Sequence, residues 1–514
     1  MFRSIRRFTH TWSASLAWRR SALLPILLAL LAGHFILVQL LTGAQFLDAP
    51  RNLHWGLLTW EQPAFLLDGL DIYERIKGFP PDPPELGPLG LWKNPYAGLH
   101  SWWGPLAPGL FALVWGASRS YTLLQLVIPL AAGATVLLTY WMGRALIDER
   151  AAVVAAIFLS LYPLFREYGS VAYNEALGAL VLTGALFAYL RGRTTVAVLL
   201  GTLAALTKMD LLALYSGTVA LSAFYDRFAG RRELSWSHHI VCLIGPLALA
   251  APWIWGHYLG GGERTPTRGL SFELFTIILP MMVELTFYIP WYGVVLTLGV
   301  IGAIIARGLR AGALPRLTAM ALGIWLGLGF LVVLIYCATP GAGNSPRIFI
   351  PALPSLALLF GAGFTRLPRA WQRRAGLYLG VLFLTINAYV IWYQAAAYGA
   401  PIRAAAPAFH ELRQREQGFV LTPIYWETIL YTRQRATWFE ADDVFRDTIM
   451  GDAGHFAHYV EQHPIRYVLL PNSTTGPGPR NPAAPAVRAY LDARAERIDT
   501  GAWTLWVLPR ASDN

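Results

Sequence analysis

A few ionisable side chains stand where long apolar stretches of this sequence stop or start. Asp48 follows the first apolar run, Glu175 opens a later one, and Lys208 and Arg347 stand at two further boundaries. Carboxylates can take up protons, and fixed cations can stabilise developing negative charge. Two of each on one face therefore fit one type of reaction, in which a proton is removed and negative charge builds up.

Three further residues stand near the same boundaries. Arg166 lies in "PLFREYGSVAYNEALGAL", and His100 and Trp103 lie in "GLHSWWGPL". Lys208 shares the tight turn "LTKMDLL" with Asp210. Ionisable groups at or inside a membrane are costly, so they tend to mark functional sites or paired networks. We therefore treat these residues as members of one candidate site.

Each candidate also has an ordinary structural explanation. Asp48 can be a helix flank or an N-cap, and Glu175 can be a first-turn acid that the helix dipole favours. Lys208 can extend its ammonium group towards the membrane surface, and Arg347 can anchor an interface. His100, like the neighbouring tryptophans, can pack at the interface. Only the whole set, placed on one face, favours a chemical role.

The composition indicates how these residues are positioned. The chain has 514 residues, of which 55% are hydrophobic and only 14% charged, whereas soluble domains have about 25% charged residues. Apolar runs of roughly 18 to 22 residues recur along most of the length and are typical of membrane-spanning helices. The sequence therefore predicts an α-helical polytopic membrane protein. The net charge of +11 reflects arginines in short connections, which set orientation and give no reason to expect nucleic acid.

The arginines predict a topology. Placing all the short arginine-bearing segments on the cytoplasmic side satisfies the positive-inside rule, puts the N-terminus in the cytoplasm and puts the C-terminus outside. The richness in Ala, Gly, Pro and Arg favours a bacterial source, and hence the plasma (inner) membrane. The arrangement requires about eleven spans, near residues 22–42, 121–143, 151–165, 175–191, 194–207, 209–225, 238–258, 289–306, 317–337, 348–365 and 375–396.

This topology divides the chain into two domains, 1–398 in the membrane and 399–514 outside it. Residues 43–120 form a long external loop. Its apolar piece at 103–116 is too short to cross a membrane and is predicted to lie in the outer interface, as is 272–285. After residue 398 the strand-like pieces "GFVLTP", "RYVLLP" and "TLWVLP" predict a small extracytoplasmic α/β domain.

The order of these parts resembles the GT-C glycosyltransferases, especially the branch with the protein O-mannosyltransferases and the aminoarabinose transferase of lipid A. "FLDAP" places Asp48 just after the first span, and "HSWWGPLAPGLFALVWG" is similar to the family's interfacial helix. "YPLFREYGSVAYNEALGAL" places Glu175 at the family's acid. "LTK" and "PRIFIPALP" are similar to two further motifs and supply Lys208 and Arg347.

Two positions depart from the family pattern. Ala49 follows Asp48, where the family commonly has Asp-Glu. Trp103 with a single Pro105 stands where some members have Lys before paired prolines. The cation that such a lysine supplies must come from elsewhere in this chain or be absent.

The resemblance implies an inverting transfer of a sugar from a polyprenyl-phosphate carrier to an acceptor protein, lipid or glycan at the outer face. It implies that Asp48 is the general base and that Lys208 and Arg347 stabilise the leaving phosphate. Glu175 would position the sugar or the acceptor, support the base or help to hold a metal. The other expected substrate contacts are Arg166, His100 and Trp103.

Several alternatives stay open. Two carboxylates make a sparse site for a divalent cation, so metal dependence does not follow from the sequence. A transporter or flippase for a polar lipid or solute also places ionisable residues inside a bundle, usually near the midplane and with inverted repeats. A non-catalytic subunit of a cell-envelope assembly is the third interpretation. Loss of Asp48 without loss of activity would favour it.

Overall fold

The computed structural model describes one short helix near the N-terminus and most of the chain from residue 104 onward. Asp48, His100, Trp103 and the predicted interfacial helix at 272–285 lie outside the described residues. Those residues are 29–37, 104–118, 120–170, 173–230, 233–254, 291–337, 346–394, 400–424, 428, 432, 434–437, 449–463, 465–472 and 483–509.

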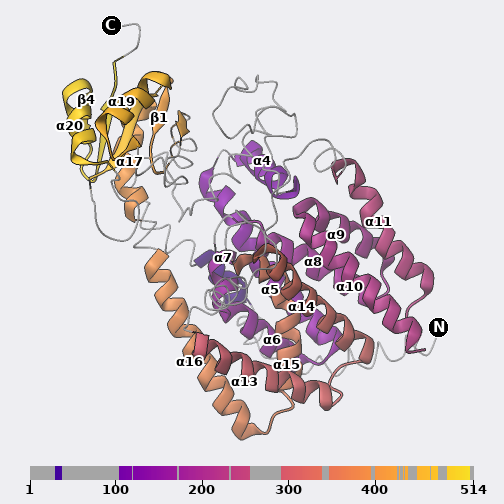
Figure 1. Cartoon of the computed structure of the whole chain (residues 1–514). Helices are drawn as coiled ribbons and strands as arrows, with labels where there is room; N and C mark the ends of the chain where they lie inside the picture. Colours follow the sequence, from indigo (N-terminus) through magenta and orange to yellow (C-terminus); the bar gives the residue numbers. More distant parts are fainter. Residues whose placement is uncertain are drawn as a thin grey trace.

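Helices account for nearly all of the described chain up to residue 394 (Figure 1). Each predicted span overlaps a helix, and the first overlaps residues 29–37. Within the described residues, six helices are long and apolar enough to cross a membrane, and a bent pair makes a seventh candidate. The predicted fold class is confirmed. The helices are α4 (Leu106–Ser118), α5 (Tyr121–Leu146), α6 (Glu149–Leu161), α7 (Pro163–Gly169), α8 (Glu175–Leu190), α9 (Thr194–Thr207), α10 (Met209–Phe228), α11 (Trp236–Ile254), α13 (Trp291–Arg310), α14 (Arg316–Cys337), the 3₁₀-helix η4 (Pro346–Ala352), α15 (Leu353–Phe364) and α16 (Arg369–Gln394).

Helices form here because an apolar environment requires every backbone polar group to find a partner within its own segment. At the start of α6 the Asp148 carboxylate accepts a hydrogen bond from the Ala151 N–H at 2.8 Å. At its end Pro163, which lacks an N–H, starts the separate helix α7. The axis turns by 66° between α6 and α7. The sequence predicts one uninterrupted span over 151–165, so this bend is a correction.

Helix α15 runs through the middle of the bundle. The segment Arg347–Phe364 is 89% buried, far more than most of the other candidate spans. A Cβ atom on Gly363 would lie 2.0 Å from the carbonyl oxygen of Ile304 in α13. One on Gly361 would lie 2.3 Å from the carbonyl oxygen of Ala151 in α6. Because both obstacles are backbone atoms, α6 and α13 approach α15 at distances that only glycine permits.

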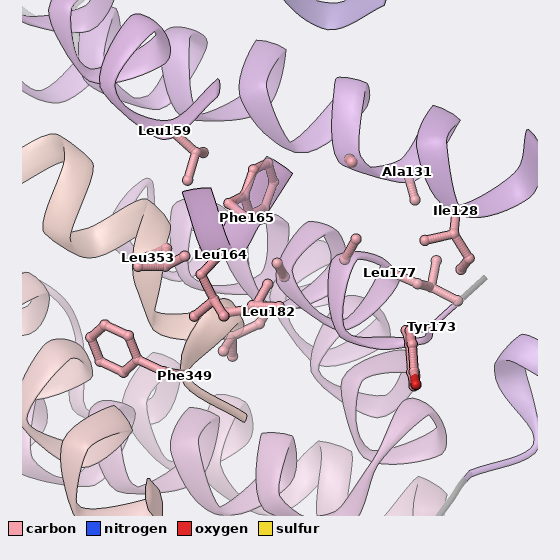
Figure 2. Packing of buried hydrophobic residues seen from close by; sticks show 14 of the residues in the cluster. Ile128, Ala131, Leu159, Leu164, Phe165, Tyr173, Leu177, Leu182, Phe349 and Leu353 are labelled. Carbon is pink, nitrogen blue, oxygen red and sulfur yellow. The ribbon is translucent and has the colours of Figure 1, made fainter. Parts of the chain in front are cut away.

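Apolar side chains of α5 to α8, η4 and α15 share one buried core (Figure 2). Leu164 and Phe165 of α7 point in different directions, and both are fully buried. Phe165 meets Phe35 of the first helix edge to face, with 5.4 Å between ring centroids. The short helix α7 is therefore held on more than one side.

Helices α8 and α9 are short for a membrane. Their 16 and 14 residues extend roughly 24 and 21 Å, against about 30 Å for the hydrocarbon layer. The turn that joins them, at 191–193, is exposed, whereas Glu175 and Lys208 at their other ends are buried. We infer that the shortfall lies at the Glu175 and Lys208 end, which is recessed below the membrane surface.

The residues after α16 form a mixed sheet with helices around it, at one end of the bundle (Figure 1). The strand order is β2-β1-β3-β5-β4; β1 is parallel to β2 and β3, and β5 is antiparallel to β3 and β4. The three strand-like pieces of the sequence overlap β1, β3 and β5, and the last two of these strands begin one residue earlier than expected. The elements are α17 (Ala400–Gln414), β1 (Phe419–Leu421), β2 (Arg435–Thr437), α19 (Ala453–Gln462), β3 (Ile465–Pro471), α20 (Pro485–Arg494), β4 (Glu496–Asp499) and β5 (Trp503–Val507).

Candidate functional site

Three of the predicted residues meet in one buried ion cluster. The Glu175 Oε1 atom lies 3.3 Å from Arg347 Nε and 3.8 Å from Lys208 Nζ. Lys208 Nζ also lies 3.4 Å from Asp210 Oδ2. The cluster therefore joins α8, the turn between α9 and α10, and η4.

The ends of the helices position these side chains. Glu175 and Asp210 stand in the first turns of α8 and α10, where the positive end of the helix dipole favours a carboxylate. Lys208 is the single extended residue between α9 and α10, with φ −165° and ψ 140°. Arg347 stands at the start of η4. Three segments, α8, the α9–α10 turn and η4, thus bring two carboxylates and two cations to one place.

Burial makes the pairing in this cluster important. The side chains of Glu175, Lys208, Asp210 and Arg347 are only 3, 10, 10 and 14% exposed. Buried charges are tolerated when opposite charges and hydrogen bonds balance them. Arg347 also lies over the Tyr173 ring, with its Cζ atom 4.6 Å from the centroid. The guanidinium group is therefore fixed on one face by Tyr173 and at one edge by Glu175.

Several buried polar atoms of this region have no hydrogen-bond partner among the described residues. They include Oε2 of Glu175, Oδ1 of Asp210, and both the Oδ1 and the Nδ2 atoms of Asn174. Asn174 is the N-cap residue of α8, yet its side chain does not cap the helix. Buried polar groups usually have partners, so these atoms suit contacts with a polar ligand.

The end of the predicted external loop docks on the same turn. The Gly104 N–H donates a hydrogen bond to the carbonyl oxygen of Thr207 at 2.9 Å, directly before Lys208. Trp103 precedes Gly104 in the chain but lies outside the described residues, as do Asp48 and His100. Their roles stay predictions.

Arg166 is not part of the ion cluster. It lies on α7, is 2% exposed, and forms no ion pair with Glu175 in the described part of the structure. Among the described residues, the ionisable groups whose charges act on it or respond to it are Glu167 and His34. The described members of the predicted set therefore separate into a cluster around Glu175 and a buried arginine outside that cluster.

Sequence reasoning did not assign Tyr173, Asn174 or Gly104 to the site. Tyr173 and Asn174 directly precede Glu175, so their position in the chain was the available signal. Nothing in the sequence marks Gly104 as the partner of a turn so far along the chain. Among the described residues, no three His, Cys, Asp or Glu side chains are grouped so that they could hold a metal ion.

A second polar network lies at the opposite end of the bundle. The His239 ring donates from Nε2 to Asp226 Oδ2 at 3.2 Å and accepts at Nδ1 from the Tyr189 hydroxyl at 2.9 Å. The Asp226 carboxylate also accepts from the N–H groups of Glu233 and Leu234. The network ties α8, α10 and α11 to the connection between α10 and α11.

No protein-family model and no curated protein matches the sequence. Solved structures do match its fold. ArnT from Cupriavidus metallidurans, bound to undecaprenyl phosphate, superposes with a TM-score of 0.61 at 12% identity, over 95% of this chain and 98% of that one. The Archaeoglobus fulgidus oligosaccharyltransferase in its apo form gives 0.53 at 13% identity, over 85% of this chain and 69% of that one. The arabinofuranosyltransferase AftD from Mycobacteria gives 0.50 at 14% identity, over 94% and 40%. The chain has the GT-C fold.

The GT-C fold agrees with the resemblance seen in the sequence motifs. The match to ArnT covers nearly the whole of both chains, so it includes residues on both sides of position 398. At 12% identity the match establishes the fold and the multi-pass membrane architecture. Within this GT-C chain, Glu175, Lys208, Asp210 and Arg347 converge at the polar end of α8 and α9.

Proposed function

We propose that this chain is a glycosyltransferase that moves a sugar from a polyprenyl-phosphate carrier to an acceptor at the outer membrane face. The observation that carries the proposal is the buried Glu175–Lys208–Arg347 cluster at one end of a GT-C bundle. ArnT, whose fold this chain shares, has been solved with undecaprenyl phosphate. A recessed cluster suits a substrate whose lipid tail stays in the bilayer.

Lys208 and Arg347 would stabilise the leaving phosphate. As the bond between the anomeric carbon and the phosphate oxygen breaks, the electron pair leaves with the phosphate, and fixed cations lower the energy of that charge. Arginine suits this role because its planar guanidinium group can contact two phosphate oxygens at once. Tyr173 and Glu175 hold the group in one orientation before the substrate arrives.

The carboxylates would serve the other half of the reaction. The acceptor hydroxyl oxygen forms the new bond to the anomeric carbon from the face opposite the phosphate, so the configuration inverts. Its proton goes to the general base, for which Asp48 is the candidate. Glu175 keeps Lys208 and Arg347 together, and Asp210 balances the second cation.

The test measures transfer of labelled sugar from a panel of polyprenyl-phosphate sugars by the purified full chain. We expect Lys208→Gln, Arg347→Gln and Asp48→Asn each to lower transfer by about a hundredfold or more. Arg366→Gln is the matched control. Arg366 also forms an ion pair, with 3.7 Å between its Nη1 atom and Asp148 Oδ2, but both side chains are exposed. Full activity in all three site variants would overturn the proposal.

The same panel separates the competing interpretations. A transporter or flippase would move the labelled lipid across a reconstituted vesicle without loss of its sugar. The Glu175, Lys208 and Arg347 cluster lies at the ends of its helices and not at their middle, which favours the transferase. A chain that neither transfers nor moves any donor would point to an assembly subunit.

A further inference from the structure

Arg166 is a buried cation with unused hydrogen-bonding groups. It is the fourth residue of α7, it is 2% exposed, and none of its three guanidinium nitrogens has a hydrogen-bond partner among the described residues. Its backbone is already engaged: the carbonyl oxygen accepts from Ser170 Oγ, and the N–H donates to Tyr162. A buried charge whose hydrogen-bond donors are all unused is costly, so this side chain indicates a ligand.

A second basic side chain with an unused nitrogen lies near it. His34, on the helix at 29–37, is close enough to Arg166 for their charges to interact. Its Nδ1 atom lies 2.6 Å from the Leu31 carbonyl oxygen and therefore carries the hydrogen. Its Nε2 atom is buried and faces the backbone of Ser160, but it makes no hydrogen bond of normal geometry in the described part of the chain. Among the described residues, Glu167 is the one whose attractive charge acts on Arg166.

The helix that carries His34 has one exposed face. It packs on α7 through Phe35 and Phe165. On the same helix Leu30 and Leu37 are 66% and 54% exposed, as expected for side chains that face lipid. A single helix therefore separates α7 from an apolar exposed surface, and a lipid head group is one source of the ligand.

We propose that Arg166, assisted by His34, binds a phosphate-type oxyanion from a lipid head group or from free phosphate. A guanidinium group offers a planar pair of donors that matches two oxygens of a phosphate. The bound anion would also favour protonation of His34, whose Nε2 would then donate to a third oxygen. The site is separate from the Glu175 cluster, where two carboxylates already balance two cations. It does not depend on sugar transfer.

Thermal unfolding of the full chain in detergent tests the site. The parent protein is purified without added lipid and titrated separately with inorganic phosphate, phosphatidylglycerol and undecaprenyl phosphate. The variants are Arg166→Gln, Arg166→Lys and the double variant Lys208→Gln/Arg347→Gln. The matched control is Arg191→Gln, an exposed arginine at the other end of α8.

We expect at least one phosphate compound to raise the Tm of the parent, and this rise should saturate with increasing ligand concentration. For inorganic phosphate or phosphatidylglycerol, the concentration at half-maximal shift should rise by about ten- to hundredfold in Arg166→Gln, because charged hydrogen bonds are lost. For undecaprenyl phosphate, which the Glu175 cluster would also bind, the double variant shows the share that depends on Arg166. The concentration at half-maximal shift should rise by a smaller factor in Arg166→Lys, which keeps the charge but loses the paired donors of the guanidinium group. The rise in Tm caused by inorganic phosphate or phosphatidylglycerol should persist in the double variant and in Arg191→Gln. A response to inorganic phosphate identifies a free anion, and a response to lipids alone identifies a head group.

In anion-free buffer, the direction in which Arg166→Gln changes the Tm separates a binding role of Arg166 from a structural one. If Arg166 is a binding residue, ligand-free Arg166→Gln should unfold at the same Tm as the parent or higher, because a buried charge without hydrogen bonds has been removed. A Tm that falls equally with and without the phosphate compounds would overturn the proposal. A parent whose Tm responds to none of the compounds would also overturn it. If Arg166→Gln does not fold, the decisive result is Arg166→Lys: a concentration at half-maximal shift equal to that of the parent would overturn the proposal.

Discussion

The backbone N–H of Gly104 donates a hydrogen bond to the carbonyl oxygen of Thr207, with 2.9 Å between nitrogen and oxygen. A Cβ atom at residue 104 would lie 1.9 Å from the carbonyl oxygen of Leu206. No side-chain rotation can relieve such a clash, because the obstacle is backbone. The start of α4 is therefore joined to the turn that carries Lys208 by a contact that only glycine allows.

Gly104→Ala is expected to displace that turn and to lower sugar transfer by about a hundredfold, the loss that a misplacement of roughly 1 Å can cause. The measurement is transfer from the donor that the parent uses best. Gly109→Ala on α4 is the matched control, because a Cβ atom there meets nothing within 4 Å. Equal activity in the two variants would show that the contact does not position Lys208.

Tyr173 is expected to hold Arg347 through its ring and not through its hydroxyl. Tyr173→Leu removes the cation–π contact, which is 4.6 Å long, and should raise the donor KM by roughly two- to thirtyfold. Tyr173→Phe keeps the ring and should resemble the parent. Steady-state kinetics with varied donor distinguishes them. If the Phe variant is as impaired as the Leu variant, the hydroxyl is the important group.

The Asp226 network is expected to matter for stability and little for transfer. Asp226→Ala leaves the His239 ring and two backbone N–H groups without their acceptor, which should lower the free energy of unfolding by about 2 to 4 kcal/mol. Thermal unfolding in detergent measures the loss. Glu233→Ala is the control, since it keeps the backbone donor and removes an exposed side chain. A large loss of transfer at a temperature where the variant stays folded would contradict this assignment.

Asp452 should make the start of α19 sensitive to acid. The N–H groups of His455 and Gly454 hold the pKa of Asp452 below its usual value. A lowered pKa means that the carboxylate stabilises the folded state above its unfolded pKa of about 3.9 and that this effect is lost as the pH falls through the folded pKa. The protection of the α19 amides, after correction for the pH dependence of intrinsic exchange, should therefore fall below about pH 4 in the parent.

The comparison with two variants isolates this titration. Asp452→Asn still caps the helix but does not titrate, so its exchange should not show the acid step. Asp452→Ala should exchange faster than the parent at pH 7, and the difference should shrink in acid. An acid step of equal size in the Asn variant would assign the effect to another group.

Most of the membrane part of the fold is predictable because each helix is an apolar run with a polar boundary. The helix α9, Thr194–Thr207, begins and ends at the predicted residues, and α8 ends one residue early. The bend at Pro163 is a failure of the same reasoning. Hydropathy continues across the proline, so only its missing N–H signals that α6 stops at Leu161.

The site was predictable only in part. Glu175, Lys208 and Arg347 come together because topology places the ends of their helices on one face. The direction of Arg166 was not predictable, since it depends on the 66° bend before α7. The contact between Gly104 and Thr207 is likewise a matter of tertiary packing that no local pattern encodes. Asp48, His100 and Trp103 stay predictions.

The burial of α15 has a consequence for biosynthesis. Its close neighbours α6 and α13, which meet it at Gly361 and Gly363, are made before it. A chain is synthesised from its N-terminus, so these helices enter the membrane while the place of α15 is still filled by lipid. Helices α6 and α13 can reach their final contacts only after α15 has displaced that lipid and packed Gly361 and Gly363 against them. Assembly of the bundle is therefore a late event that follows the insertion of its separate helices.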